Sequence, residues 1–386
     1  MKQLIAITSG AVLLLLACGQ SIQTGSSDDN SHLREVPQLP KIERTYALAD
    51  YLSEDEQLNK DVDSIFASLD DTAIVAQLIM PAVGEYGQTL ATIKKHINKR
   101  QIGGVLMLNG TKDEFTKWIR DFNAMNVKLG NPGFLYSADA EPSLVNRKIK
   151  GSHPVKKANE METAFEVSAY ADTIAFDLKD IGINYNFSPV VDMSPNKTVG
   201  FRSFGAVPAN IIPWSNAFIQ ATQRQGIIAT AKHFPGHGLV SGDTHKSLQV
   251  IDGELKEIGN YPQLIADGVL SIMIGHLAVA NNPKYNTNGL PSTTSKVIVT
   301  DLLRNEMGFK GLIVTDAMNM GGVTAIPNCN VKAVEAGCDI VLMPLDAAKA
   351  HSAILKKYRT DSAFKAQVDA AAKRILRMKL CVGAIK

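Results

Sequence analysis

Residues 226–245 read GIIATAKHFPGHGLVSGDTH, an apolar run that passes directly into a polar segment rich in glycine and histidine. The apolar part, Gly226–Ala231, is continuous in hydrophobicity, whereas a strand with one face in water would alternate. A continuous run is typical of a strand that is buried on both faces, as in a parallel sheet. The sequence therefore predicts a parallel strand whose carboxyl end leads into a cluster of ionisable side chains.

Other parts of the chain repeat this pattern, with helix-like stretches such as Glu160–Asp180 and Ile212–Gln225 between the apolar runs. Eight runs share the pattern: Ala76–Pro81, Gly103–Leu108, Gly133–Ser137, Ile183–Val191, Gly226–Ala231, Leu270–Ile274, Gly311–Thr315 and Asp339–Met343. Eight strand–helix units predict an α/β fold of the (β/α)8 TIM-barrel type. A doubly wound open sheet is the alternative, but no glycine-rich dinucleotide turn follows the first run.

The predicted barrel indicates where a functional site should lie. In such barrels the site forms at the carboxyl ends of the strands. Ionisable residues follow five of the runs, namely Asp139, Asp192, Lys232-His233, His276 and Asp316. Taken singly, each is explained equally well as a polar cap at a strand end. Taken together, they predict a convergent ring of ionisable groups at one face of the barrel.

The segment after the fifth run carries an aspartate and a histidine two positions apart, Asp243 and His245. In an extended segment such side chains point to the same side, so the carboxylate can contact the imidazole. An Asp–His pair orients the imidazole and makes it a better proton carrier. Metal binding by His233, His237 and His245 with Asp243 is the alternative, but the spacing matches no standard zinc pattern. We therefore expect a proton-transfer pair and no metal.

Asp316 ends the run GLIVT and is followed by AMNM. A carboxylate at this place would project into the barrel mouth, where it could act as a nucleophile or stabilise charge in glycosyl transfer. The alternative is that Asp316 caps the helix that follows the strand.

From about Ala73 to its end the chain resembles the single-domain β-N-acetylglucosaminidase (β-hexosaminidase) branch of glycoside hydrolase family 3. The resemblance rests on KHFPGHG at Lys232–Gly238, the triplet Asp243-Thr244-His245, NYNFSPV at Asn184–Val190, RSFG at Arg202–Gly205, VTDAMNM around Asp316 and AGCDIVLMP at Ala336–Pro344. It implies retaining hydrolysis of terminal β-linked GlcNAc from peptidoglycan fragments or chitooligosaccharides. Asp316 would form a glycosyl–enzyme intermediate. His245, held by Asp243, would protonate the leaving oxygen and later activate water, with no metal or organic cofactor.

The resemblance also implies a set of sugar-binding residues. These are Asp139, Arg147, Arg202, Lys232 and His233. Asp139 and Arg147 match the first and last residues of a DQEGGRVQR-like segment, which here reads DAEPSLVNR, so Pro142-Ser143-Leu144 replaces Gly-Gly-Arg. This departure leaves the sugar preference open. A β-glucosidase of the same fold and a non-catalytic glycan-binding lipoprotein are the alternatives, although the Asp-Thr-His triplet favours the hexosaminidase.

The N-terminus predicts export. Met1-Lys2 precedes an apolar stretch, Leu4–Leu16, and Leu15-Leu16-Ala17-Cys18 resembles a bacterial lipobox. We expect residues 1–17 to be a signal peptide, Cys18 to carry the lipid, residues 18–45 to form a flexible tether and residues 46–386 to form the catalytic barrel. A plain secretory signal is the alternative. The protein is therefore expected to be a monomer anchored to a membrane outside the cytoplasm, at the outer membrane in a Gram-negative cell.

The bulk composition argues against two other classes of function. The formal net charge is +2, so no strong basic field favours nucleic acid. Three further cysteines, Cys329, Cys338 and Cys381, lie in no CxxC motif. A zinc site built on them is not expected, and they are either free thiols or one disulfide with a free thiol.

Overall fold

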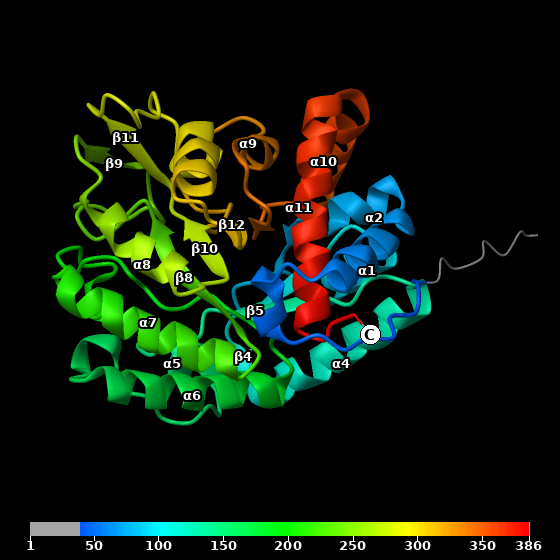
Figure 1. The fold of residues 1–386 in the computed structure, drawn as a ribbon, viewed down its shortest axis with the longest axis horizontal. Coiled ribbons are helices and arrows are strands. Elements are labelled where there is room, and N and C mark those ends of the chain that lie inside the picture. The colour runs from blue at the N-terminus through cyan, green and yellow to red at the C-terminus, as the bar shows by residue number, and fades with distance from the viewer. Residues whose placement is uncertain (1–38, 386) are drawn as a thin grey trace, which may run out of the picture. The chain divides into compact units, whose positions relative to one another are not determined.

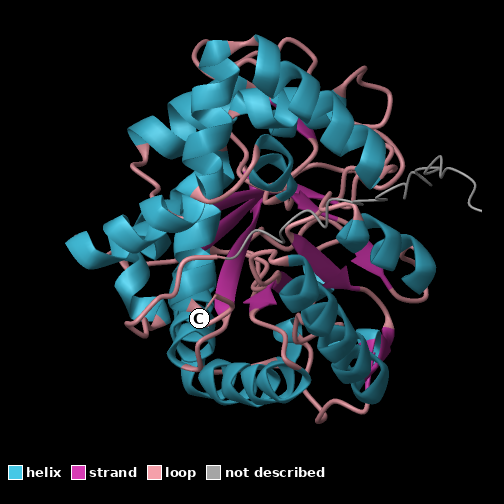
Figure 2. Ribbon diagram, turned by 90° about the vertical axis from the view of Figure 1, so that its right-hand side faces the viewer, coloured by secondary structure: helices cyan, strands magenta, loops and turns pink. Residues whose placement is uncertain are grey.

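The computed structural model describes residues 39–385, all within one compact unit. Parallel strands form its centre, and helices surround them as an outer layer (Figure 2). The central strands are β1 (Ile79–Met80), β2 (Ala82–Val83), β3 (Gly104–Met107), β5 (Leu135–Ala138), β7 (Tyr185–Asn186), β8 (Ile228–Phe234), β10 (Ser271–Ile274), β12 (Leu312–Thr315) and β13 (Val341–Leu342). Seven of them form one sheet in the order β12-β10-β8-β7-β5-β3-β2.

The sheet closes on itself through β13 and β1. These two strands pair in parallel, and an isolated bridge joins Val314 of β12 to Ile340, next to β13. Only Pro81 separates β1 from β2, so these two short strands occupy one position in the ring. Each of the eight apolar runs contributes to a barrel strand. The predicted (β/α)8 barrel is therefore confirmed.

The helices pack around the barrel, and α6 and α7 lie side by side (Figure 1). They are α1 (Glu56–Ala67), α2 (Asp71–Ala76), α3 (Leu90–Asn98), α4 (Lys112–Leu129), α5 (Val145–Lys148), α6 (Ala164–Ile181), α7 (Pro208–Arg224), α8 (Tyr261–Ala266), α9 (Cys329–Ala336), α10 (Ala347–Thr360) and α11 (Ser362–Cys381). A π-helical segment, Val297–Glu306, lies between β10 and β12. Across residues 39–385, no helix combines the length and the apolar character that crossing a bilayer requires.

Two helix starts differ from the sequence prediction, each for a local reason. Helix α6 begins four residues after Glu160, because the Thr163 hydroxyl accepts the Glu166 N–H at 3.1 Å and caps the helix there. Helix α7 begins four residues before Ile212, at Pro208. Proline suits the first turn of a helix, where its missing N–H has no partner to lose.

Strand β8 is longer than predicted and this changes the setting of the site. It continues beyond Ala231 to Phe234, so Lys232 and His233 lie within the strand and not in the loop after it. The Lys232 carbonyl accepts the Val191 N–H at 2.7 Å, as expected in a sheet. The apolar run ends at Ala231 because the next residue is a lysine, although the strand continues. The charge of this lysine is paired inside the barrel.

The predicted signal peptide, Cys18 and the first part of the predicted tether lie outside the described residues. Of the last part, Leu39 and Ile42 are partly buried and pack against the core of the barrel. The three later cysteines are free thiols, of which Cys338 and Cys381 are buried.

Candidate active site

A cavity of about 540 Å³ opens at the carboxyl ends of the strands. Seven of the eight residues predicted to act on or bind the sugar line it: Asp139, Arg147, Arg202, Lys232, His233, His245 and Asp316. The eighth, Asp243, lies beside His245. The fold thus brings together residues that are far apart in sequence, as the barrel predicts.

On one wall of the cavity, Asp139, Arg202 and Lys232 form a network with Glu141, which lies behind them. These four side chains are here called the buried charge cluster. Lys232 Nζ lies 2.7 Å from Asp139 Oδ1 and 2.5 Å from Glu141 Oε1. Arg202 donates to both oxygens of Glu141, Nε to Oε2 and Nη2 to Oε1, each at 2.7 Å. A bidentate contact of this kind fixes the guanidinium plane as well as its position.

Both carboxyl groups of the buried charge cluster are ionised at neutral pH. Burial would raise the pKa of Glu141, but the charges of Arg202 and Lys232 outweigh burial and hold the pKa at about 2. Burial acts likewise on Asp139, and the charges of Lys148 and Lys232 hold its pKa well below the usual value. Buried ions need such partners, because an unpaired charge there would be very costly. The cluster is therefore a rigid set of charged donors and acceptors facing the cavity.

Glu141 was not singled out from the sequence, although it lies two residues after Asp139. Its side chain is fully buried, so it supports Arg202 and Lys232 from behind and does not line the cavity. The signal was present in the order Asp139-Ala140-Glu141, but only the fold shows that the glutamate meets a lysine from β8.

Arg147, which the sequence matched to a sugar-binding arginine, lines the cavity with an exposed side chain, and its guanidinium makes no hydrogen bond or ion pair to any residue in 39–385. Its neighbour Lys148 instead contacts Asp139, with Nζ 2.5 Å from Oδ2. The side chain of Lys148 is only 15% exposed. Asp139 therefore contacts two lysines, Lys148 and Lys232.

His233 is held by a carboxylate behind it. Its Nδ1 lies 2.6 Å from Asp192 Oδ2, and Asp192 Oδ1 also accepts the backbone N–H groups of His233 and His237. Burial would raise the pKa of Asp192, but His233 and these hydrogen bonds hold it below the usual value. Asp192, predicted as a member of the ring, therefore orients His233 and does not itself line the cavity.

Asp316 differs from the other carboxylates in its hydrogen bonds. Its Oδ1 accepts the Ala317 N–H at 2.7 Å, while within residues 39–385 no group donates to Oδ2. Burial would raise the pKa of Asp316, but His233, His276 and the Ala317 amide together hold it below the usual value. Asp316 is therefore an ionised carboxylate in the cavity with one oxygen available to a ligand.

His276 lies behind Asp316 and not in the cavity. Its Nε2 is 3.0 Å from the Ala317 carbonyl, and its Nδ1 is 2.9 Å from the Thr293 hydroxyl. A carbonyl can only accept, so Nε2 carries the proton. His276 was predicted to belong to the convergent ring of ionisable groups at the barrel mouth. This prediction is corrected, because buried polar contacts occupy both imidazole nitrogens and leave His276 a supporting role.

The Asp243–His245 contact is present, with His245 Nδ1 2.7 Å from Asp243 Oδ1. The reason differs from the one predicted. The segment is a turn and not an extended strand: Asp243 Oδ1 accepts the His245 backbone N–H at 3.0 Å, and the Lys246 N–H bonds to the Asp243 carbonyl. The His245 side chain is 60% exposed, and the imidazole lines the rim of the cavity.

This turn is attached to the segment that follows Asp316. The N–H groups of Gly321 and Gly322 donate to the carbonyls of His245 and Thr244, each at 3.0 Å. A Cβ atom at Gly321 would lie 2.2 Å from the Lys246 carbonyl oxygen. Glycine therefore permits a backbone approach that brings the Asp243–His245 pair to the side of the cavity that carries Asp316.

A buried carboxyl group holds the preceding part of the loop. Glu257 accepts the backbone N–H groups of Met193, Gly238 and Leu239 at 2.7–3.2 Å. Burial, followed by the charge of Asp192, raises the pKa of Glu257 to about 8. No sequence pattern selects this residue, since it lies in the polar stretch GELKEIG.

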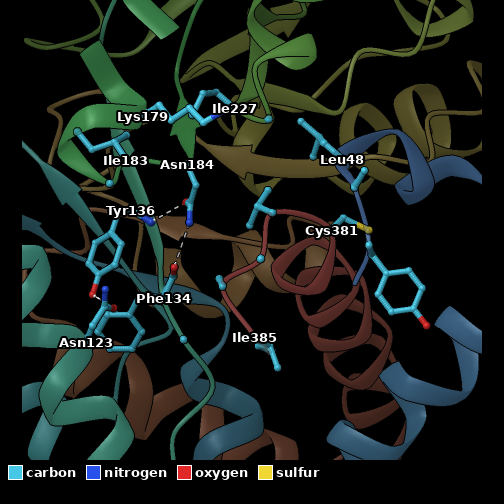
Figure 3. Close-up of a pocket in the computed structure, with 18 of the residues that line it drawn as sticks. Leu48, Asn123, Phe134, Tyr136, Lys179, Ile183, Asn184, Ile227, Cys381 and Ile385 are labelled. Atoms are coloured by element: carbon cyan, nitrogen blue, oxygen red, sulfur yellow. Dashed lines mark hydrogen bonds between the residues drawn. The ribbon is translucent and has the colours of Figure 1, made fainter. Parts of the chain in front are cut away.

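A larger cavity, of about 1280 Å³, lies at the opposite end of the barrel (Figure 3). Its lining includes the amide of Asn184, which bonds to the backbone of Tyr136 and Phe134, and the Tyr136 hydroxyl, which donates to Asn123. None of the candidate catalytic residues lines it. Among the residues that the structure describes, no group of histidine, cysteine and carboxylate side chains is arranged to hold a metal ion.

Comparison with known proteins gives a consistent result. The family model of the glycosyl hydrolase family 3 N terminal domain matches residues 71–378. A β-N-acetylglucosaminidase/β-glucosidase of Cellulomonas fimi is 28% identical over 64% of this chain and 49% of its own length. A β-hexosaminidase of Hydrogenovibrio crunogenus is 30% identical over 58% of this chain and 66% of its own length. The chain thus spans between about half and two thirds of the length of these relatives.

A solved structure agrees with the fold over most of the chain. The β-N-acetylhexosaminidase of Beutenbergia cavernae superimposes with a TM-score of 0.71 at 27% sequence identity. The match covers 80% of this chain and 98% of that one.

Proposed function

The chain belongs to glycosyl hydrolase family 3, and from that membership we propose that it is a retaining exo-β-N-acetylhexosaminidase. Its substrates would be peptidoglycan fragments or chitooligosaccharides with a terminal β-linked GlcNAc. One observation carries the proposal: Asp316, with an oxygen that meets no donor in residues 39–385, shares a cavity with the Asp243-supported imidazole of His245. The names of the Hydrogenovibrio and Beutenbergia relatives support the choice of sugar.

In the proposed first step, Asp316 Oδ2 attacks the anomeric carbon and the bond to the leaving oxygen breaks. His245 donates its Nε2 proton to that oxygen, while Asp243 accepts the Nδ1 hydrogen bond and stabilises the imidazolium form beforehand. The product is a glycosyl ester of Asp316. In the second step the neutral imidazole takes a proton from water, which attacks the anomeric carbon and releases Asp316.

The buried charge cluster would hold the terminal sugar during both steps. Lys232 and Arg202 are fixed donors, and Asp139 is a fixed acceptor for hydroxyl groups. Because the cluster is already ordered, little conformational entropy is lost when the sugar binds. His233, oriented by Asp192, adds a further polar contact at the cavity floor.

The proposal is tested with the purified full-length chain in mild detergent, assayed on aryl β-GlcNAc and aryl β-glucoside. We expect turnover of the first. Turnover of the glucoside alone would favour a β-glucosidase, as the double name of the Cellulomonas fimi relative allows. Binding of GlcNAc without turnover of either compound would favour a non-catalytic glycan-binding protein.

We further propose that the protein is exported, anchored through a lipid on Cys18 and monomeric. The lipobox-like sequence Leu15-Leu16-Ala17-Cys18 supports the export and the anchor. Mass spectrometry of the membrane fraction should find Cys18 as a diacylated N-terminal residue, and Cys18→Ser should abolish the modification. An unprocessed N-terminus or a mature chain without acyl groups would contradict the anchor.

A further inference from the structure

We infer that His237 is a positioning residue, which holds the turn Asp243–His245 in place through the hydroxyl group of Thr244. The inference rests on the proposed function, because it concerns the place of the proton donor in the same cavity. It gives a role to the second histidine of the segment KHFPGHG, which the proposed mechanism does not use.

The turn carries its proton donor near the surface. His245 is exposed and Asp243 is partly exposed, and the hydrogen bonds between them orient the imidazole only within the turn. The backbone bonds from Gly321 and Gly322 attach the turn on one side, to the segment after Asp316. A proton donor must stay within hydrogen-bond reach of the leaving oxygen, and a displacement of about 1 Å can cost about 10²-fold in rate. A second attachment, on the side of the sugar-binding strand β8, would fix its position.

Thr244 supplies this second attachment, because it is the buried member of the turn. Its side chain is covered, although both of its neighbours in the chain are at least partly exposed. Its hydroxyl oxygen lies 3.0 Å from His237 Nε2. Within residues 39–385, His237 is the only residue outside the turn that forms a hydrogen bond with a side chain of the turn. In the described chain, this contact is therefore the one side-chain link between the turn and the end of β8.

His237 is itself held firmly, three residues after the end of β8. Its backbone N–H donates to Asp192 Oδ1 at 2.8 Å. The next backbone N–H, that of Gly238, donates to Glu257 Oε1 at 3.2 Å. Two buried carboxyl groups therefore fix the backbone from which the imidazole extends to Thr244.

The imidazole of His237 makes its one hydrogen bond to the turn. Its Nδ1 is buried and meets no hydrogen-bonding group in residues 39–385, so only the contact with Thr244 remains. Burial, followed by the charge of His233, lowers the pKa of His237, so the imidazole is neutral at neutral pH. A hydroxyl group can donate or accept, so either neutral tautomer can make the contact. The link therefore needs no charge, and a neutral side chain of similar reach should replace it.

The experiment measures kcat/KM for His237→Leu and Thr244→Val on two β-GlcNAc glycosides, one with a poor leaving group and one with an activated aryl group. Each substitution removes one side of the hydrogen bond and nearly keeps the volume of the side chain. We expect a loss of about 10- to 100-fold on the poor leaving group, which needs the proton, and of less than about threefold on the activated one. The double variant should lose no more than the larger single loss, since both substitutions remove the same link.

Two controls separate this role from a general contribution to folding. His237→Gln keeps a hydrogen-bonding group near the place of Nε2 and should recover most of the rate. His351→Leu removes a buried histidine of α10, whose Nε2 lies 3.0 Å from the Thr72 carbonyl oxygen. It should lower the melting temperature but leave the ratio of the rates on the two glycosides unchanged. Equal losses on both glycosides in His237→Leu would indicate direct contact with the sugar and overturn the inference, as would additive losses in the double variant.

A measurement without turnover separates the inference from the proposed function. Lys246, directly after the turn, is exposed, so trypsin cleavage after it reports how often the turn opens. Mass spectrometry after brief digestion should find this cut about 3- to 10-fold faster in His237→Leu than in the wild type, and at the wild-type rate in His351→Leu. If the wild type hydrolyses neither glycoside, the proposed function fails. Faster cleavage in His237→Leu would still support the link to the turn, and an unchanged rate would overturn it.

Discussion

The cavity at the amino ends of the strands measures about 1280 Å³, and the one at the carboxyl ends about 540 Å³. The larger cavity is lined by apolar and amide side chains with three cations, and no carboxylate occurs among its described lining residues. Its cations, Lys128, Lys179 and Arg224, lie at the last turns of α4, α6 and α7. Helix dipoles favour cations at such positions, so the helices explain them without a ligand.

The smaller cavity has the opposite character. Its charged groups come from strand β8 and from segments that follow other strands, and most are held by a second ionised group. Asp316 lies among these groups with one oxygen that meets no donor in the described chain. Charge paired across strands, and not volume, therefore distinguishes the end of the barrel that can carry out chemistry.

Replacement of Asp316 should reduce the catalytic rate more than any other change. Asp316→Asn keeps the volume of the side chain but removes the nucleophilic oxygen, so kcat on aryl β-GlcNAc should fall by about 10⁴-fold. Lys179→Glu at the amino-end cavity is the matched control and should leave kcat/KM unchanged. A rate for Asp316→Asn near that of the wild type, with an unchanged melting temperature, would place the nucleophile elsewhere.

Breaking the buried charge cluster should reduce stability as well as activity. Glu141→Leu removes the carboxylate that Arg202 contacts and leaves Lys232 with Asp139 alone, and such a loss costs about 3–5 kcal/mol. Urea unfolding monitored by circular dichroism measures the change. Asp301→Leu, which removes the partner of the exposed Lys296 at 2.7 Å, is the control and should cost well under 1 kcal/mol, as surface pairs do. Equal losses in the two variants would mean that the cluster adds nothing beyond a surface contact.

His245→Ala should have an effect that depends on the leaving group. A glycoside with a poor leaving group needs the proton and should slow by about 10²- to 10³-fold, whereas one with an activated aryl group should change little in the bond-breaking step. Asp243→Asn should act in the same direction with a smaller effect. The slope of log kcat/KM against leaving-group pKa is the measurement, and an unchanged slope would exclude His245 as the acid.

The smallest change in stability is expected for Lys379, a buried lysine near the end of the barrel at which the strands begin. Lys379 donates to Gln77 at 2.6 Å, and burial lowers its pKa to about 7. An unfolded lysine keeps its proton up to about pH 10.4, so the unfolded chain binds more protons between these values. Wild-type stability should therefore rise as the pH increases through this range.

Lys379→Met should accordingly be more stable than the wild type at pH 7, by about 1–3 kcal/mol after allowance for the lost hydrogen bond. The advantage should shrink as the pH approaches 10. Chemical unfolding at several pH values checks the sign. A constant difference across the range would show that Lys379 stays protonated in the folded state.

Much of the fold could be predicted from the sequence, because a strand buried on both faces shows as an unbroken apolar run. The same reasoning placed Asp139 and Asp316 directly after strands. It missed the last residues of β8, since the charge of Lys232 ends the apolar run while its partners lie about 90 residues away in the chain. Contacts between distant segments leave no local signal.

The candidate site was predictable only in part, for the same physical reason. Motif matching selected Arg147, which lines the cavity, but only the fold shows that its neighbour Lys148 contacts Asp139. His276 and Asp192 were expected at the cavity, yet buried partners hold both behind it. Glu257 had no signal, and the signal of Glu141 was only its place two residues after Asp139, because a buried acid and an exposed one look alike in sequence.

The two hydrogen bonds from Gly321 and Gly322 to the turn that bears His245 have a consequence for dynamics. An amide proton in a hydrogen bond exchanges with deuterium only when that bond opens. These two amides belong to the segment after Asp316, while their acceptors belong to the turn that carries the proton donor. The exchange rates of these two amides therefore measure how often the turn that carries the proton donor moves away from the nucleophile.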